Sequence, residues 1–199
     1  FFEGFDFAIS NLNGKAAPAA SPMNAGQLMK ELSVYRLIHG YRKKGHLIAK
    51  TNPIRPSKNR EANLELENFG LSEADLKTEF YAGSFVGMGK APLEKILAFL
   101  QRTYAGSVGI QFTYIKDQTR EQWLQKEIEA TLQQPVPLEK RKRILSKLNE
   151  GVIFEKFLHT KYIGQKRFSL EGGETSIPAL DAILNVAGEY GVQESVIGM

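Results

Sequence analysis

The chain has 199 residues, of which 42% are hydrophobic and 24% are charged, and its net charge is +4 at pH 7. This length suits one or two domains with buried cores, and the composition is ordinary for a globular protein. The absence of cysteine excludes disulfides, thiolate metal sites and a cysteine nucleophile. The three histidines are scattered and argue against a zinc or iron site. With no bilayer-length apolar run and no signal-peptide pattern, we expect a soluble, intracellular protein.

Residues 1–23 are expected to form an aromatic segment followed by a linker. Four of the first seven residues are phenylalanine, and such a cluster normally packs against a larger surface. Residues 14–21 are rich in alanine and proline, which is typical of a flexible linker.

Residues 24–163 are predicted to form a helical domain. Asn24 and Gln27 resemble the capping box that opens a helix, and Gly45 is placed to end that helix. Its apolar residues recur at helical spacing, and they are Leu28, Leu32, Tyr35 and Ile38. A loop is expected at residues 51–60, where two prolines occur.

The rest of this helical domain is divided by further capping signals. Ser72 and Asp75 predict a short helix, and Pro92 predicts the first turn of another that ends near Tyr104. Residues 108–114 alternate between apolar and polar or small side chains, which predicts a short strand. Two later helices are expected, and they begin at Asp117 and Pro137.

Residues 164–199 follow a different pattern, because a helix from Ser176 to Gly191 precedes a β-prone segment, residues 195–199. This order is typical of the opening of an α/β sheet. A lone final strand has no partner, so we expect the chain to stop within a domain. The predicted fold class is therefore mainly α, with a helical domain followed by the beginning of an α/β domain.

Several common site motifs are absent from the sequence. It contains no glycine-rich dinucleotide fingerprint, no P-loop and no nucleophile elbow. The basic run from Lys140 to Arg143 lacks aromatic stacking platforms, so a solvated helix face is the preferred interpretation. The cations between Tyr41 and His46 precede a helix end, which favours helix termination over a subunit contact.

The segment from His159 to Glu174 offers the best candidate site. Two cations, an amide and a hydroxyl lie close together in Gln165, Lys166, Arg167 and Ser169, ahead of a glycine pair and a new helix. These groups would suit a ligand that carries carboxylates or phosphate. The alternative is a loop that joins two domains, with Lys166 or Arg167 paired to Glu171 or Glu174.

The sequence HTKYIGQKRFSLEGG, residues 159–173, resembles the thiamine-diphosphate-dependent, decarboxylating component of 2-oxoglutarate dehydrogenase. Supporting matches occur at residues 1–5, at residues 41–46 with Asn52 and Pro53, and at Asp117 with Trp123. The resemblance thus covers essentially the whole chain. It departs from the family at Lys44, where arginine is usual, and at the positions Gln111, Thr113 and Tyr114.

The resemblance implies that Phe168, Lys166 and Arg167 line the substrate side of the active site. It implies substrate-binding roles for Gln165, Ser169 and Glu171. The family's cofactors are thiamine diphosphate and Mg²⁺, but Gly-Asp, which begins the ion-binding signature, does not occur in this chain. No cofactor or metal ligand is therefore expected here, and these ligands, with a substrate-binding His-Arg-Gly-Arg, are expected beyond Met199. The chain alone is expected to be inactive.

The resemblance also implies assembly and location. It implies a homodimer that works with dihydrolipoamide succinyltransferase and dihydrolipoamide dehydrogenase in the tricarboxylic acid cycle. The expected location is the cytoplasm of a bacterium or the mitochondrial matrix, with neither nucleic acid nor membrane as a partner. The competing hypothesis is a non-catalytic helical module whose basic helices bind an acidic partner or RNA.

Overall fold

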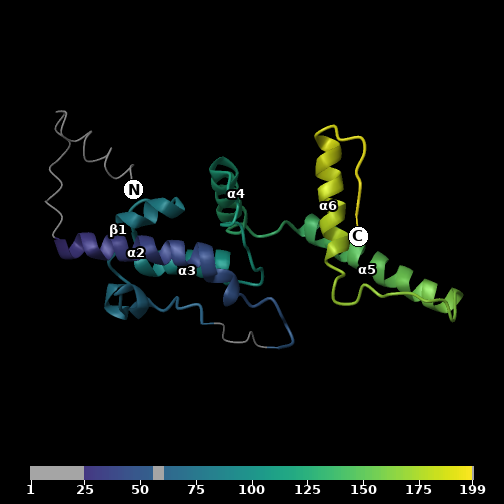
Figure 1. Cartoon of the computed structure of the whole chain (residues 1–199), viewed down its shortest axis with the longest axis horizontal. Helices are drawn as coiled ribbons and strands as arrows, with labels where there is room; N and C mark the ends of the chain where they lie inside the picture. Colours follow the sequence, from purple (N-terminus) through teal and green to yellow (C-terminus); the bar gives the residue numbers. More distant parts are fainter. Residues whose placement is uncertain (1–24, 56–60, 199) are drawn as a thin grey trace. The chain divides into compact units, whose positions relative to one another are not determined.

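The computed structural model describes residues 25–55 and 61–198, and these residues are mainly helical (Figure 1). They belong to two compact units, which are residues 1–134 and residues 135–199. The expected domain boundaries at residues 23 and 163 stay predictions. The predicted aromatic segment, the linker and Asn24 lie outside the described residues, as does part of the predicted loop at 51–60.

The first unit contains three α-helices, four short 3-10 helices and one strand pair among its described residues. In chain order these are α2 (Ala25–Lys44), η1 (Gly45–Leu47), η2 (Leu66–Phe69), η3 (Glu73–Asp75), β1 (Glu79–Phe80), η4 (Tyr81–Val86), β2 (Ala91–Pro92), α3 (Leu93–Tyr104) and α4 (Gln118–Thr131). The two strands are antiparallel, with Phe80 opposite Ala91.

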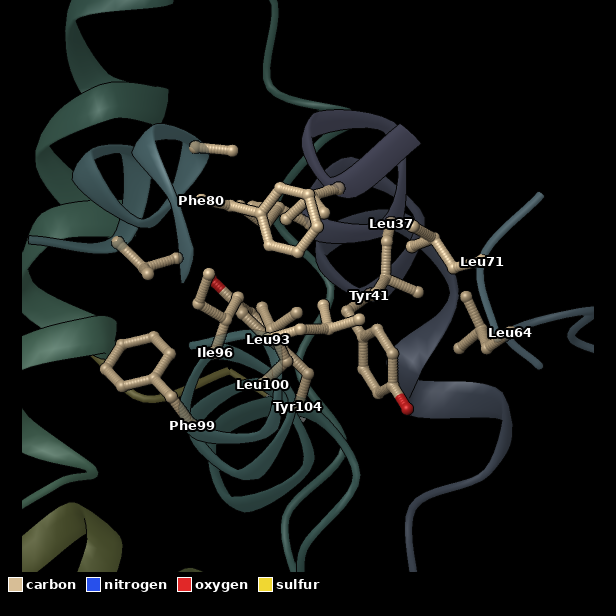
Figure 2. Close-up of a cluster of buried hydrophobic side chains, with 14 of the residues drawn as sticks. Leu37, Tyr41, Leu64, Leu71, Phe80, Leu93, Ile96, Phe99, Leu100 and Tyr104 are labelled. Carbon is tan, nitrogen blue, oxygen red and sulfur yellow. The ribbon is translucent and has the colours of Figure 1, made fainter. Parts of the chain in front are cut away.

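The core of the first unit lies between α2 and α3 (Figure 2). Leu37 of α2 and Leu93 and Leu100 of α3 are fully buried, and Phe80 of β1 is 1% exposed. Fully burying an apolar side chain of this size contributes about 1.5–3 kcal/mol, so this cluster is the main source of the unit's stability.

Only some of the apolar residues predicted to line α2 are buried in the core. Ile38 is fully buried, but Leu28 is 59% exposed and Leu32 is 47% exposed. The buried face is offset around the helix and consists of Val34, Leu37, Ile38 and Tyr41. Two apolar faces compete in this sequence, and only the one that meets α3 becomes core.

Three of the predicted helix starts are confirmed, two of them by cap hydrogen bonds. Asp75 Oδ2 accepts a hydrogen bond from the backbone N–H of Ser72 at 3.0 Å, and the short helix η3 follows. Asp117 Oδ1 accepts from the backbone N–H of Thr119 at 3.0 Å at the start of α4. Pro92 directly precedes α3. Such caps satisfy the free N–H groups of a first turn and depend on neighbouring residues alone.

Both predicted strands are wrong for the described residues. Residues 108–114 form no strand, although Phe112 is 3% exposed and stacks on Tyr104 with ring centroids 6.4 Å apart. Of the predicted strand at residues 195–199, the described residues 195–198 also have no strand assignment. In both segments the β-prone pattern lacks a partner strand to complete a ladder, and an unpaired strand is not stable.

The second unit is a pair of helices, α5 (Leu138–Lys161) and α6 (Ser176–Glu189), joined by a loop. Arg143 of α5 pairs with Asp181 of α6 at 2.7 Å. Ile177 packs closely on Gly151, because a Cβ there would lie 2.4 Å from its Cδ1. The four residues of the predicted basic run are exposed on α5, and Lys142 also pairs with Glu139. Lys140, Arg141 and Lys142 thus form a solvated helix face, as predicted, while Arg143 also contacts α6.

The second unit lacks a buried core among its described residues, where Pro178 is the single buried residue. Phe154 is 60% exposed, Phe157 is 53% exposed and Ile183 is 62% exposed. Apolar exposure of this extent marks a surface that normally contacts something else. None of the helices in the described ranges is both long enough and apolar enough to cross a membrane.

Candidate functional site

All six predicted site residues lie in the loop between α5 and α6, and all six are exposed. They are Gln165, Lys166, Arg167, Phe168, Ser169 and Glu171. The loop, defined here as residues 162–175, begins where α5 ends and leads into the first turn of α6. The structure therefore brings the predicted residues together on one segment, accessible to a ligand.

The conformation of the loop depends on two glycines. Gly164 has φ +84° and Gly172 has φ +88°, and L side chains rarely adopt this left-handed region. A turn follows in which the N–H of Gly173 donates to the carbonyl of Leu170 at 2.8 Å. Gly172 and Gly173 thus turn the chain sharply ahead of α6.

A hollow of about 520 Å³ lies at the C-terminal end of α5. Its lining is His159, Thr160, Tyr162, Ile163, Gly164, Gln165 and Arg167. The lining combines hydrogen-bonding groups with one guanidinium, which suits an anionic or strongly polar ligand. Of the six predicted residues, Gln165 and Arg167 line this hollow, while the other four lie outside it.

Lys166 and Phe168 face each other on the exposed side of the loop. The Lys166 Nζ lies 5.6 Å from the centroid of the Phe168 ring, within the range of a cation–π contact. Phe168 is 84% exposed, so the ring is available to a ligand. This contact holds the cation beside an apolar surface rather than beside a carboxylate.

The structural alternative for this loop, an ion pair that neutralises its cations, is not formed. Neither Lys166 nor Arg167 is in an ion pair with any residue that the structure describes. Glu174 instead accepts a hydrogen bond from the backbone N–H of Gly172 at 2.9 Å. Among the described residues, no carboxylate therefore neutralises either positive charge.

The N-terminus of α6 contributes less to an anion site than the sequence suggests. The N–H of Ser176 donates to the carbonyl of Gly173 at 2.9 Å, and the N–H of Ile177 donates to that of Glu174 at 3.1 Å. These donors are occupied within the loop itself. An anion at this site would consequently be bound by side chains rather than by the first amides of the helix.

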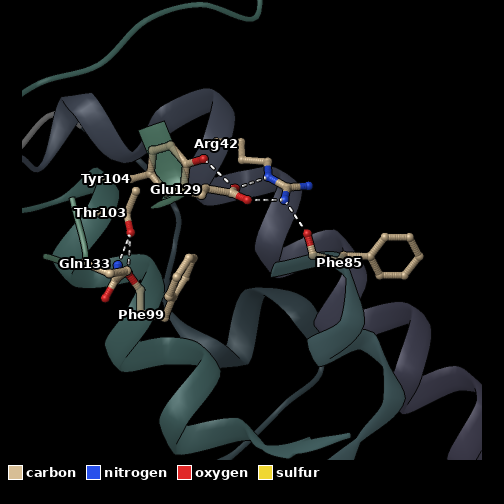
Figure 3. A network of polar contacts seen from close by, with 7 residues as sticks. All are labelled: Arg42, Phe85, Phe99, Thr103, Tyr104, Glu129 and Gln133. Carbon is tan, nitrogen blue, oxygen red and sulfur yellow. Dashed lines mark hydrogen bonds and ion pairs between the residues drawn. The ribbon is translucent and has the colours of Figure 1, made fainter. Parts of the chain in front are cut away.

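A second polar cluster, in the first unit, was missed by the sequence analysis (Figure 3). Arg42 of α2 pairs with Glu129 of α4, and its Nη2 also donates to the carbonyl of Phe85 at 2.6 Å. The hydroxyl of Tyr104 donates to Glu129 Oε1 at 2.6 Å. The spacing of Arg42 in the sequence could have indicated this cluster. Arg42 follows the apolar Ile38 by four residues, which places it on the core face of the helix.

Burial governs the electrostatics of this cluster. Burial and the hydrogen bond to the Glu129 carboxylate raise the pKa of Tyr104 far above its ordinary value. Burial also raises the pKa of Tyr41, and burial together with the charge of Arg42 lowers the pKa of His39. Both carboxylate oxygens of Glu129 accept hydrogen bonds from protein groups. The cluster is thus a structural tie between helices and offers no open ligand position.

The described residues do not fit a diphosphate held by Mg²⁺. Such a site needs carboxylate or carbonyl oxygens grouped around the ion. Within residues 25–55 and 61–198, no group of three or more histidine, cysteine, aspartate or glutamate side chains could hold a metal ion. No catalytic step that passes through such a group is assigned to these residues.

Comparison with known proteins gives relatives over most of the chain, although no protein-family model matches it. The chain is 43% identical over 173 residues to the multifunctional 2-oxoglutarate metabolism enzyme of Mycolicibacterium vanbaalenii, a match that covers 85% of the chain and 14% of that protein. It is 43% identical over 173 residues to the 2-oxoglutarate dehydrogenase E1 component of Cupriavidus necator, which covers 85% of the chain and 18% of that protein.

A third relative extends the match further along the chain. The E1 component of 2-oxoglutarate dehydrogenase from Azotobacter vinelandii is 37% identical over 189 residues, which is 93% of the chain and 20% of that protein. The chain therefore spans between 14% and 20% of the length of these curated relatives.

Proposed function

The chain is related to the 2-oxoglutarate dehydrogenase E1 components over most of its length, and we propose that it forms part of such an enzyme. The reaction proposed is the decarboxylation of 2-oxoglutarate, after which the succinyl group passes to the lipoyl group of a succinyltransferase component. The relatives that support this are 36% to 43% identical to the chain. Because the chain spans a small part of them, it supplies only a part of the proposed active site.

The part proposed for this chain is one wall of the substrate site, formed by the loop at residues 162–175. The observation that carries this proposal is the exposure of two cations, Lys166 and Arg167, which form no ion pair with a described residue, on a loop bordering a polar hollow. A substrate with two carboxylates gains charge-assisted hydrogen bonds from such cations. Phe168 offers an exposed apolar face to the carbon chain of the substrate.

The remaining predicted residues take supporting roles in this proposal. Gln165 and Ser169 would hydrogen-bond the polar groups of the substrate, since an amide and a hydroxyl can both donate and accept. Glu171 would act at the edge of the site, where its charge helps to orient the neighbouring cations. The Ser169 hydroxyl also accepts from the backbone N–H of Glu171 at 3.0 Å, which fixes these two residues relative to each other.

Thiamine diphosphate and Mg²⁺ are the proposed cofactors, and we assign their ligands to polypeptide outside these 199 residues. The chain spans only 14% to 20% of the length of its relatives, which supports this assignment. When bound, the cofactor would supply the electron sink for decarboxylation. The contribution proposed for this chain is to bind and orient the substrate, and the chain alone is expected to be inactive.

The proposed partners are a second copy of the same subunit and the dihydrolipoamide succinyltransferase and dehydrogenase components. One relative, from Corynebacterium glutamicum, is named a 2-oxoglutarate dehydrogenase E1/E2 component, so two component names are joined in that protein. Because the relatives considered are bacterial, the cytoplasm is the proposed location.

The test is an activity assay on the complete natural polypeptide that contains this sequence. We expect release of carbon dioxide from 2-oxoglutarate that depends on thiamine diphosphate and Mg²⁺, with succinyl transfer when the partner components are added. A polypeptide that binds no thiamine diphosphate, or that leaves 2-oxoglutarate unchanged, would overturn the proposal. Tight, salt-sensitive RNA binding in its place would favour the non-catalytic alternative.

A further inference from the structure

The loop that contains the candidate site is tied to α5 by one side chain, Glu155. Its Oε1 accepts a hydrogen bond from the backbone N–H of Leu170 at 2.7 Å, across 15 residues of sequence. The other hydrogen bonds of the loop join neighbouring residues, such as Glu171 to Ser169 and Gly173 to Leu170. In the part of the chain that the structure describes, this is the longest-range polar tie that the loop makes.

The position of the tie gives it a direct influence on the candidate site. Leu170 lies between Ser169 and Glu171 and two residues after Phe168. A hydrogen bond that holds its N–H therefore also restrains these three predicted site residues. Leu170 also packs toward the following turn, since a Cβ at Gly173 would lie 3.4 Å from the Leu170 Cδ1. Leu170 is 39% exposed, against 84% for Phe168. The loop is thus anchored at Leu170 and open on either side of it.

We propose that Glu155 is a positioning residue that holds the segment from Phe168 to Glu171 in place against α5. Glu155 makes no ion pair with a described residue, so this hydrogen bond is the one interaction of its carboxylate that involves the loop. A carboxylate that accepts from a backbone N–H forms a stronger hydrogen bond than a neutral acceptor does. The assignment of an effect on substrate binding rests on the function proposed above, but the effect on the loop does not.

Three variants of the full chain separate this role from a general effect of mutating α5. Glu155→Ala removes the acceptor, while Glu155→Gln keeps a carbonyl oxygen at the same reach. Glu150→Ala is the matched control, because Glu150 lies on the same helix and its hydrogen bonds go to Ser146 and Lys147 of that helix, the second at 2.7 Å. Circular dichroism of all three variants establishes whether α5 is retained.

The direct readout is hydrogen exchange at the backbone N–H of Leu170. We expect exchange about tenfold faster in Glu155→Ala than in the natural chain, which corresponds to the loss of one hydrogen bond of ordinary net strength. Glu155→Gln should restore most of the protection, and Glu150→Ala should leave it unchanged. Trypsin should cleave after Lys166 and Arg167 several-fold faster in Glu155→Ala, with cleavage after Lys147 unaffected.

Two results would overturn the proposal. One is exchange at Leu170 in Glu155→Ala equal to that of the natural chain while α5 is intact. The other is equal acceleration in Glu150→Ala, because loss of any carboxylate on α5 would then suffice. In the complete enzyme, Glu155→Ala should raise the KM for 2-oxoglutarate more than it lowers kcat, because a more mobile loop spends less time in the conformation that binds substrate. Glu155→Gln should have a KM close to that of the natural enzyme.

The two proposals fail in different ways. If the complete natural enzyme has no activity toward 2-oxoglutarate while exchange at Leu170 still depends on Glu155, the proposed function is wrong and the positioning role stands. If the enzyme is active but exchange at Leu170 does not depend on Glu155, the proposed function stands and the positioning role is wrong.

Discussion

Arg42 and Glu129 lie 87 residues apart in the chain and form a bidentate ion pair, with Nε 2.8 Å from Oε1 and Nη2 3.1 Å from Oε2. Their side chains are 5% and 11% exposed. Helix α4 packs only the partly buried Leu124 and Ile128 against the core, so this pair is a principal polar link between α4 and the rest of the first unit. The link joins α4 to α2 directly and to α3 through Tyr104.

Breaking this pair from one side should be costly. Glu129→Ala leaves the Arg42 guanidinium buried without its counter-charge, which typically costs about 3–5 kcal/mol. The double variant Arg42→Met with Glu129→Leu removes both charges, so its free energy of unfolding should lie closer to that of the natural chain. Denaturant unfolding followed by circular dichroism measures both. Equal losses in the single and double variants would show that the ion pair is not what holds α4.

Tyr104 should make the first unit sensitive to alkali. Because its pKa is raised above the ordinary value of 10.0, the folded state retains the phenol proton more firmly than the unfolded state does. This contribution to stability is complete below about pH 10 and is lost as the pH rises above it. Tyr104→Phe should cost about 1.5–3 kcal/mol at neutral pH through the lost hydrogen bond to Glu129.

The pH dependence of that variant gives the sharper test. The free energies of unfolding of Tyr104→Phe and the natural chain should converge as the pH rises past about 10, because the phenylalanine has no proton to lose. Urea unfolding at a series of alkaline pH values provides the curves. Parallel curves would contradict the raised pKa.

Asp75 should make the stability of the first unit sensitive to acid. Its hydrogen bond with Lys30, and further ones from Ser72, lower the pKa of this buried carboxyl below the ordinary value of 3.8, although burial opposes them. The contribution to stability is therefore complete above that value and is lost as the pH falls through the lowered pKa. Asp75→Ala should cost about 1 kcal/mol at neutral pH, as loss of a helix cap does. Its acid unfolding curve should also be flatter than that of the natural chain.

Gly45 should not tolerate a side chain. A Cβ at this position would lie 2.6 Å from the Cβ of Tyr104 and 2.9 Å from its carbonyl oxygen. Gly45→Ala therefore forces α2 and α3 apart and should lower stability by about 1–3 kcal/mol. Gly188→Ala, within α6, is the control, since a Cβ there meets nothing within 4 Å. Thermal unfolding should show a lower Tm for Gly45→Ala alone.

The cations of the loop should control substrate binding in the complete enzyme. Lys166→Ala and Arg167→Ala should each raise the KM for 2-oxoglutarate about tenfold or more, because each removes a charge-assisted hydrogen bond. A 2-oxo acid without a second carboxylate should be affected less. Lys156→Ala removes an exposed cation from α5 and is the control. Unchanged kinetics in both loop variants would exclude these cations from the substrate site.

Features set by neighbouring residues could be predicted from the sequence. The caps at Ser72 and Asp117 and the helix stop at Gly191 depend on groups within a few residues of each other, and the structure forms all three. The loop at residues 162–175 could also be found, because its residues are contiguous in the chain.

Features set by distant partners could not be predicted in the same way. The pattern at residues 108–114 fits a strand, but whether a strand forms depends on a partner that a local pattern does not reveal. Glu129 has no local sign of its pairing with Arg42. The partner of Glu155 is a backbone N–H, which every residue except proline carries, so no residue type marks it.

The exposed apolar side chains of α5 and α6 have a thermodynamic consequence. Water around such groups carries excess heat capacity, and removing them from water lowers it. Any surface that covers Phe154, Phe157 and Ile183 should therefore bind with an enthalpy that becomes more negative as the temperature rises. Titration calorimetry at several temperatures would give the heat-capacity change of binding as the slope of the binding enthalpy against temperature. The size of that change reports how much apolar surface of the second unit is buried.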